Sequence, residues 1–505
     1  MHPAEKRGSW GPRAAALALL LFACDPLDPA LLGEPHCDEI RVTRRSLGAN
    51  VVLIVNDAMR RDRAGVYGGK ARTPRLDAFG RDHLVFDRAV TQAPSTRPSI
   101  ATLFTSLHPS QHRVYLQPLE DAGTGPPRPR AGAETDTLSE EFLTLAELLR
   151  AAGYRTAAIV SNPWMDARFG FAQGFEHYED GLARWDAPGE AVTAAALDWL
   201  ANLRPDERYF LYVHYIDSHR PYGRLERDEV ERLRHSMLAA PRPLGSEGNE
   251  LVRKVLKLAD GSSVMSAAAR PSRDLIARAY DRGVEDFDRA LGILVDGLAA
   301  HPAWEQTAVF VTSDHGEALF DRGYGNHGRG LFDDEAAIPL VVRLPGTAAD
   351  GPRVQCLVGL VDLLPTLCDY LGLETPAWAA GWSFLAAAGE PASGLRYVVT
   401  EGVTGRPRHR SIRNRHFKLM YEPGGSPDGS DRATPFALYD LRHDSAERYD
   451  RRDPGRRAPE FDDAFRVFED ALPDAVPAFT GPQPISAPLD AQLGERLREL
   501  GYVDE

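Results

Sequence analysis

The sequence predicts an α/β protein with a large, mostly parallel sheet sandwiched by helices, followed by a smaller C-terminal antiparallel α+β subdomain. Two observations predict this fold. Apolar runs rich in β-branched residues alternate with helical patterns from Asn50 to about residue 390, and this alternation is typical of a parallel sheet covered on both faces. Short strands joined by turns replace it towards the C-terminus, which indicates an antiparallel sheet.

The first predicted strand, Val51 to Val55, is a continuous apolar run, as expected for a strand buried on both faces. A helix at Leu145 to Arg150, ended by Gly153, precedes a strand at Thr156 to Val160. The other predicted elements are strands at Tyr209 to Tyr215, Thr307 to Thr312 and Leu340 to Leu344, a helix at Ala277 to Leu298, and C-terminal strands at Tyr397 to Thr400, Ser411 to Arg413 and Phe417 to Tyr421.

Composition divides the chain into regions. Basic residues and a short apolar run before Cys24 predict a signal peptide at residues 1–23, because the run is too short to span a bilayer. Leu21 to Cys24 resembles a bacterial lipobox, although Phe22 leaves ordinary signal cleavage open. We expect an exported protein of the bacterial cell envelope, on the periplasmic side or the cell surface, held in the membrane by a lipid on Cys24. We also predict a Pro-rich tether at residues 24–48. The rest of the chain divides into a main domain at 49–390, with a variable insertion at about 223–273, and a C-terminal subdomain at 391–505.

The composition also limits the function. The chain has 505 residues, of which 43% are hydrophobic and 26% charged, so it can bury a large core in one or two domains. Its net charge of -14 argues against a general nucleic-acid binder. Apart from Cys24, the cysteines fit no zinc motif and allow at most one disulfide. Cys356 and Cys368 lie in apolar surroundings and are predicted to be small core residues.

One stretch, Thr91 to Ser106, places a hydroxyl residue two positions before a proline that opens an apolar helix. Pro98 suits the first helical position, and Ile100 and Phe104 repeat at helical spacing. Thr96 would then lie just outside the helix N-terminus, where unpaired N–H groups and the macrodipole favour an anion. On these residues alone, a cap is the more ordinary role of such a threonine.

Polar residues that follow strands form the second candidate site. Asp57, Asp314 and His315 each come just after a predicted strand, and the carboxyl ends of strands in an open α/β sheet are where ligands bind. One divalent cation held by these residues and the oxygen of Thr96 would have a mixed oxygen and nitrogen shell, which suits Ca, Mg, Mn or Zn. Such an ion would activate the hydroxyl of Thr96 as a nucleophile. On these residues alone, a turn with an Asx hydrogen bond is the more ordinary role of Asp314 and His315.

Four segments, taken in order, resemble the sulfatase family of the alkaline phosphatase superfamily. They are Asn50–Arg60, Thr91–Ser106, Ser313–Glu317 and Val361–Leu367. Lys418, Phe436–Leu441 and Leu497–Tyr502 resemble the C-terminal subdomain of many relatives. The resemblance implies an alkaline phosphatase/sulfatase-like fold and a metal-dependent hydrolase or transferase acting on phosphate or sulfate esters. The expected partner is an anionic ester substrate, with envelope lipids and glycans among the candidates.

The resemblance also implies roles for two histidines. His219, in Asp217–Tyr222, and His327, in Gly325–Gly328, match residues that contact the substrate oxyanion or the leaving group. A second metal held by Asp217, His219 and His327 is the alternative. The remaining histidines considered are predicted to be solvated surface residues: His83, His108, His112, His177 and His301.

Departures from the family pattern bear on the substrate. Sulfatases proper carry Cys or Ser where this chain has Thr96 and convert it to formylglycine. Threonine cannot become formylglycine, because its extra methyl group would leave a ketone. Ile100 stands where the family has an arginine, and Asn56 replaces one of two paired aspartates. We therefore expect phosphoryl chemistry, through a phosphothreonine intermediate, ahead of sulfuryl chemistry. A sulfuric ester hydrolase using unmodified threonine and a catalytically silent, envelope-anchored binding protein are the alternatives.

Overall fold

The structure is a computed structural model. It describes residues 40–42, 46, 48–115, 134–182, 187–220, 222–223, 228, 273–322, 324–328, 330–349, 353–385, 397–403, 409–422, 434–453, 468, 476 and 485–488. The predicted signal peptide, Cys24, nearly all of the tether, most of the 223–273 insertion and Leu497–Tyr502 lie outside the described residues. Among the described helices, none combines the length and the apolar character needed to cross a membrane.

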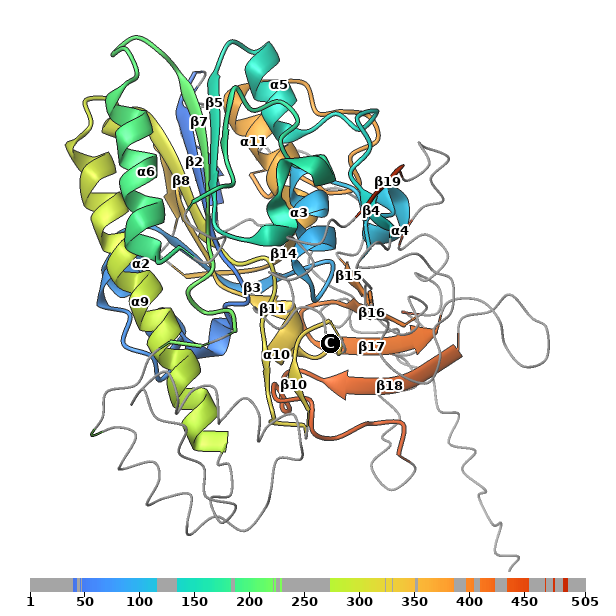
Figure 1. The fold of residues 1–505 in the computed structure, drawn as a ribbon. Coiled ribbons are helices and arrows are strands. Elements are labelled where there is room, and N and C mark those ends of the chain that lie inside the picture. Colours follow the sequence, from blue (N-terminus) through green and yellow to red (C-terminus); the bar gives the residue numbers. More distant parts are fainter. Residues whose placement is uncertain are drawn as a thin grey trace, which may run out of the picture.

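A nine-stranded sheet forms the centre of the molecule, in the order β11-β3-β12-β8-β2-β7-β5-β6 with β14 beside β3 (Figure 1). Its strands are β2 (Asn50–Asn56), β3 (Leu84–Val90), β5 (Arg155–Val160), β6 (His177–Glu179), β7 (Tyr209–Tyr215), β8 (Thr307–Thr312), β11 (Ala337–Ile338), β12 (Leu340–Arg343) and β14 (Arg353–Gly359). β2 is parallel to β7 and β8 and buried throughout. Antiparallel pairing is confined to β11 and β12, so the predicted mostly parallel sheet is confirmed.

Helices cover both faces of this sheet (Figure 1). One layer contains α2 (Pro74–Asp82), α6 (Gly189–Ala201) and α9 (Arg273–Ala300); the other contains α3 (Thr96–Thr105), α5 (Leu145–Ala151) and α11 (Leu363–Leu371). The alternation of β2 explains the two cores, because successive side chains of a strand point to opposite faces. Val52 and Ile54 pack with the first layer, whereas Val51, Leu53 and Val55 pack with the second.

The predicted C-terminal antiparallel sheet is also present. It contains β15 (Val398–Glu401), β16 (Arg410–Arg413), β17 (Phe417–Glu422) and β18 (Thr434–Asp440), paired in that order. Three small strand pairs are also present: β1 (Ile40–Val42) with β13 (Thr347–Ala349), β9 (Ala318–Leu319) with β10 (Gly325–Asn326), and β4 (Glu134–Thr137) with β19 (Ile485–Pro488). Two short α-helices are α4 (Pro109–His112) and α10 (Asp333–Ala336). The 3-10 helices lie at Arg61–Arg63, Gly65–Tyr67, Pro163–Met165, Ala167–Phe169, Trp304–Gln306 and Leu360–Asp362. The domain boundaries themselves stay predictions.

Buried charges join the C-terminal sheet to the main domain. Lys418 of β17 donates to Asp333 of α10 at 2.9 Å and lies 2.7 Å from the carboxylate of Glu447. Arg413 of β16 donates to the same Asp333 at 2.7 Å. Burial opposes ionisation of Asp333, but the charges of Arg413 and Lys418 prevail and hold its pKa well below the usual range. We call Asp333, Arg413, Lys418 and Glu447 the charged brace.

The structure bears out the predicted burial of two cysteines and overturns the predicted exposure of two histidines. Cys356 is buried in the core as predicted and is also disulfide-bonded. Cys368 is free and buried as predicted, and burial raises the pKa of its thiol to about 11. His108 and His112 are buried instead of solvated. The C-terminal sheet explains part of this burial, because Ser110 of the same short helix α4 bonds to Glu401 of β15 at 2.8 Å.

Candidate active site and metal centre

Helix α3 carries the predicted nucleophile in its first turn. The helix begins at Thr96 itself, after Ser95 in an extended conformation with φ -163° and ψ 148°. Thr96 is therefore not just outside the helix as predicted, and Pro98 is the third helical residue instead of the first. The physical reason is that the first backbone N–H groups of a helix have no intrahelical partner, so proline is tolerated anywhere in that turn. Thr96 is buried at the N-terminal end of the helix.

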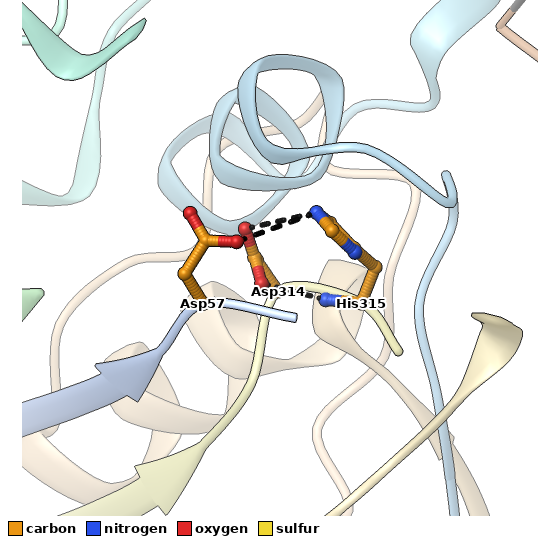
Figure 2. A group of neighbouring side chains, drawn as sticks. All are labelled: Asp57, Asp314 and His315. Carbon is orange, nitrogen blue, oxygen red and sulfur yellow. Dashed lines mark hydrogen bonds and ion pairs between the residues drawn. The ribbon is translucent and has the colours of Figure 1, made fainter. Parts of the chain in front are cut away.

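Three candidate metal ligands meet at the carboxyl end of the sheet. Asp57 directly follows β2, and Asp314 and His315 follow β8, which is the parallel neighbour of β2. Figure 2 shows the three side chains turned toward one another, and their candidate ligand atoms lie within 4.8 Å of each other. The hydroxyl oxygen of Thr96 lies 3.4 Å from Asp57 Oδ2 and 3.3 Å from His315 Nε2. The structure thus brings together all four residues that the sequence predicted.

The buried oxygens of this cluster fit a divalent cation. Asp57 Oδ1 and Asp314 Oδ2 have no hydrogen-bond partner among the described residues. His315 Nδ1 donates to the carbonyl of Gly316 at 2.7 Å, which leaves the lone pair of Nε2 for the cluster, at 3.7 Å from Asp57 Oδ1 and 3.5 Å from Asp314 Oδ2. In metal sites, a hydrogen bond from the ring nitrogen that does not bind the metal orients the histidine.

The electrostatics point the same way. Burial raises the pKa of Asp314, and the neighbouring charge of Asp57 raises it further. Burial would raise the pKa of Asp57 too, but the charge of His219 and the hydrogen bond to His214 outweigh it and lower that pKa. Burial opposes protonation of His315, yet the charges of Asp314 and Asp57 raise its pKa. Asp314 and His315 therefore hold protons more tightly than usual, and metal binding would release those protons.

The predicted histidines His219 and His327 lie beside this cluster. The His327 ring is 4.2 Å from the His315 ring and 5.1 Å from the His219 ring, centroid to centroid. His219 Nδ1 donates to the carbonyl of Arg220 at 2.7 Å, and burial lowers the pKa of this imidazole to about 4. His327 Nδ1 lies 3.4 Å from a carboxylate oxygen of buried Glu317. His327 can donate a proton to an ester oxygen, whereas neutral His219 must first take up a proton at Nε2 before it can do the same.

Asp217 does not join these histidines. Its Oδ1 accepts a hydrogen bond from the backbone N–H of Gly189, the first residue of α6, at 3.0 Å. Burial raises its pKa to about 7, and the charge of Asp286 on α9 contributes. A second metal held by Asp217, His219 and His327 stays a prediction, although these three described residues do not form a group of metal-binding geometry. Within the described ranges, Asp57, Asp314 and His315 form the only acidic and histidine cluster of metal-binding geometry.

Sequence reasoning missed two residues that contact Asp57. Asn162, two residues beyond the end of β5, donates to Asp57 Oδ2, and His214 of β7 places Nε2 3.4 Å from the same oxygen. Tyr212 supports His214 from behind, with 2.7 Å between its hydroxyl and Nδ1. The position of Asn162 after a strand was a usable signal, as for Asp57. His214 was a polar residue inside a buried apolar strand, and such a residue needs a partner.

A family model named Sulfatase matches residues 49–373. The chain belongs to the sulfatase family. The ulvan-active sulfatase of Formosa agariphila is 23% identical over 340 residues, which cover 65% of this sulfatase-family chain and 62% of that relative.

Solved structures confirm the fold of the sulfatase-family chain. A protein in complex with its substrate D-glucosamine-2-N,6-O-disulfate matches with a TM-score of 0.65 at 18% identity, covering 85% of this chain and 98% of that one. The phosphonate monoester hydrolase of Agrobacterium radiobacter matches with a TM-score of 0.57 at 21% identity, covering 84% and 96%. Membership of the family supports an ester hydrolase.

Proposed function

We propose that this chain is a metal-dependent hydrolase of anionic esters that uses unmodified Thr96 as its nucleophile, with phosphoryl chemistry favoured over sulfuryl chemistry. The observation that carries the proposal is the place of the Thr96 hydroxyl, 3.4 Å from Asp57 Oδ2 and 3.3 Å from His315 Nε2 at the N-terminus of α3. A threonine can supply only its own hydroxyl here, because oxidation of its Cβ would give a ketone.

The residues divide into ligands and proton donors. One divalent cation would be held by Asp57, Asp314, His315 and Thr96. Once bound, the cation would lower the pKa of the Thr96 hydroxyl and offset the negative charge of the ester. With its hydroxyl proton released to solvent, Thr96 Oγ1 attacks the phosphorus atom, and the bond from phosphorus to the leaving alcohol breaks. His327, or His219 once it is protonated at Nε2, donates a proton to the departing oxygen. Water then hydrolyses the phosphothreonine, which releases phosphate and restores Thr96.

The similar proteins are named for two different acid groups in the substrate, sulfate and phosphonate. The relative from Formosa agariphila is named a sulfatase, and the neighbour from Agrobacterium radiobacter is named a phosphonate monoester hydrolase. The departures at Thr96, Ile100 and Asn56 favour phosphorus over sulfur.

The test is turnover of one phenol presented as phosphate monoester, phosphodiester and sulfate ester. We expect the phosphate esters to be cleaved faster than the sulfate ester. In Thr96→Ala, turnover should fall by about a thousand-fold or more. Thr96→Ser should keep part of the activity because serine retains the hydroxyl oxygen. Thr105→Ala, at the far end of the same helix, is the matched control and should stay active. Exclusive cleavage of the sulfate ester would overturn the phosphoryl preference, and inertness toward all three esters would favour the silent binding protein.

We also propose that the protein is exported and anchored through Cys24. The disulfide at Cys356 supports an oxidising compartment, because disulfides persist mainly outside the cytosol. Metabolic labelling with a palmitate analogue tests the anchor. Cys24→Ser should lose the label while Cys368→Ser keeps it, and a mature protein that begins elsewhere and carries no label would contradict the proposal.

A further inference from the structure

A short hairpin leads from the metal cluster to His327. The chain continues from His315 into β9 (Ala318–Leu319) and returns as β10 (Gly325–Asn326), which ends directly before His327. The two strands pair antiparallel. The place of the His327 imidazole beside the site therefore depends on how the protein holds this hairpin.

The hairpin has a backbone conformation that its own residues do not favour. Phe320, directly after β9, has φ 63°, and Asn326 of β10 has φ 77°. Bulky side chains rarely adopt this left-handed region. Gly325 packs so closely on the Phe320 ring that an added Cβ would lie 2.4 Å from a ring carbon. Such a backbone persists only where its surroundings hold it, so contacts from outside the hairpin are needed.

Arg60 supplies contacts of this kind on both sides of β9. Its Nη1 donates to the backbone carbonyl of Glu317 at 3.1 Å and to Asp321 Oδ2 at 2.7 Å. The Nε and Nη2 atoms of the same guanidinium donate to the two carboxylate oxygens of Asp62, at 2.9 Å and 2.8 Å. Asp321 belongs to the hairpin, whereas Asp62 belongs to the segment of Arg60 itself. One buried guanidinium thus joins the two segments.

The backbone of Arg60 is fixed next to the metal cluster. Its N–H donates to the hydroxyl of Tyr280 on α9 at 2.7 Å, and that hydroxyl donates to the carbonyl of Ala58 at 2.6 Å. The N–H of Ala58 donates to Asp314 Oδ1 at 3.0 Å. Arg60 lies three residues beyond Asp57, so it holds the hairpin at a fixed place relative to the cluster.

We propose that Arg60 and Asp321 are positioning residues, which hold the β9–β10 hairpin so that His327 lies against the ester at Thr96. The proposal rests on the role of His327 in the proposed function. A displacement of about 1 Å in a catalytic group can lower the rate about a hundred-fold. The cation and Thr96 would still bind the ester, so loosening the hairpin should lower kcat and leave KM nearly unchanged.

The test compares two carboxylates that accept from the same guanidinium and whose side chains are both more than half exposed. Asp321→Ala removes the link to the hairpin, and kcat for an aryl phosphate should fall about ten-fold, with KM within about two-fold of the wild type. Asp321→Asn keeps an acceptor oxygen and should recover most of that loss. Asp62→Ala is the matched control: it removes a carboxylate from Arg60 but no contact with the hairpin, and it should keep kcat within about two-fold.

Hydrogen exchange of the backbone amides gives a readout besides turnover. The amides of β9 and β10 should exchange about ten-fold faster in Asp321→Ala than in the wild type, and at the wild-type rate in Asp62→Ala, because only the first variant frees the hairpin to open locally. Unchanged kcat in Asp321→Ala, or an equal loss of kcat in Asp62→Ala, would overturn this inference alone. Full activity of His327→Ala would also overturn the role of His327 in the proposed function.

Discussion

The metal cluster and the charged brace are two buried sets of charges that differ in how their negative charges are compensated. In the brace, Lys418 lies 2.9 Å from Asp333 and 2.7 Å from Glu447, so each carboxylate faces a cation. In the metal cluster, Asp57 and Asp314 face one another across a single imidazole, and each retains an oxygen without a hydrogen-bond donor among the described residues. Buried charge alone therefore does not mark a functional site. Buried charge that lacks compensation does, because it predicts a missing cation.

The two sets also differ in what surrounds them. The brace lies between α10 and the C-terminal sheet, and it holds that sheet to the main domain. The metal cluster follows the carboxyl ends of β2 and β8, and Thr96 at the start of α3 lies beside it. The comparison predicts that mutations in the cluster change chemistry at little cost in stability, and that mutations in the brace do the reverse.

Asp314→Asn should have the largest effect on chemistry. We expect the metal content of the purified protein to fall from about one ion per chain to near zero and turnover to fall about a thousand-fold. The metal-free variant should be at least as thermally stable as the metal-free wild type, because repulsion from Asp57 is relieved and the amide oxygen can still accept from Ala58. Elemental analysis and thermal unfolding measure these outcomes. Undiminished metal in the variant would remove Asp314 from the site.

Lys418→Met should break the brace. The variant leaves Asp333 and Glu447 buried without their shared cation, and loss of one partner of a buried ion pair costs about 3–5 kcal/mol of unfolding free energy. Denaturant unfolding measures this loss. One metal ion per chain should remain bound under conditions where the variant is folded. A stability close to that of the wild type, or loss of the metal, would contradict the division of roles.

A third buried set, the neutral histidines His108 and His112, should give a smaller effect that depends on pH. Burial lowers the pKa of each to about 3, below the value of about 6.5 in an unfolded chain. Above about pH 6.5 both states are neutral and the pair adds no pH dependence. Between about pH 6.5 and 3 the unfolded chain binds protons that the folded chain refuses, so the unfolding free energy falls as the pH falls, by at most about 1.4 kcal/mol per pH unit for each histidine.

His112→Gln should therefore show a shallower loss of stability between about pH 6 and pH 4 than the wild type. Denaturant unfolding across this pH range is the measurement. His301→Gln, at a partly exposed position, is the control and should keep the wild-type slope. Identical slopes for the wild type and His112→Gln would show that this histidine is not kept neutral by burial.

Local pattern was enough to predict the elements and residues that depend on neighbours in the sequence. The run Val51 to Val55 predicted a strand buried on both faces, and the position after a strand predicted Asp57, Asp314 and His315 at one edge. Both follow from alternation and from the shared direction of parallel strands. The pattern of α3 predicted a helix but misplaced its start by two residues, because proline is compatible with several positions of the first turn.

Residues whose role depends on distant partners could not be predicted in the same way. Asp217 bonds to Gly189 at the start of α6 instead of to the nearby histidines. His108 is buried close to the charge of Arg410 on β16, far away in the sequence. His214 touches Asp57 only because β7 pairs with β2 in the observed register, in which His214 lies opposite Val55. Register and packing between elements decide such contacts, and a single sequence does not specify them.

The most direct test of the account is the mass of the peptide that contains Thr96, measured before and after brief exposure of the purified protein to an aryl phosphate. A nucleophilic, unmodified Thr96 gives the unmodified threonine mass in the resting protein and a transient phosphate adduct on Thr96 during turnover. Thr96→Ala should give no adduct at this peptide, and Thr105→Ala should give the same adduct as the wild type. An oxidised residue at position 96 in the resting protein, or full turnover by Thr96→Ala, would contradict the account.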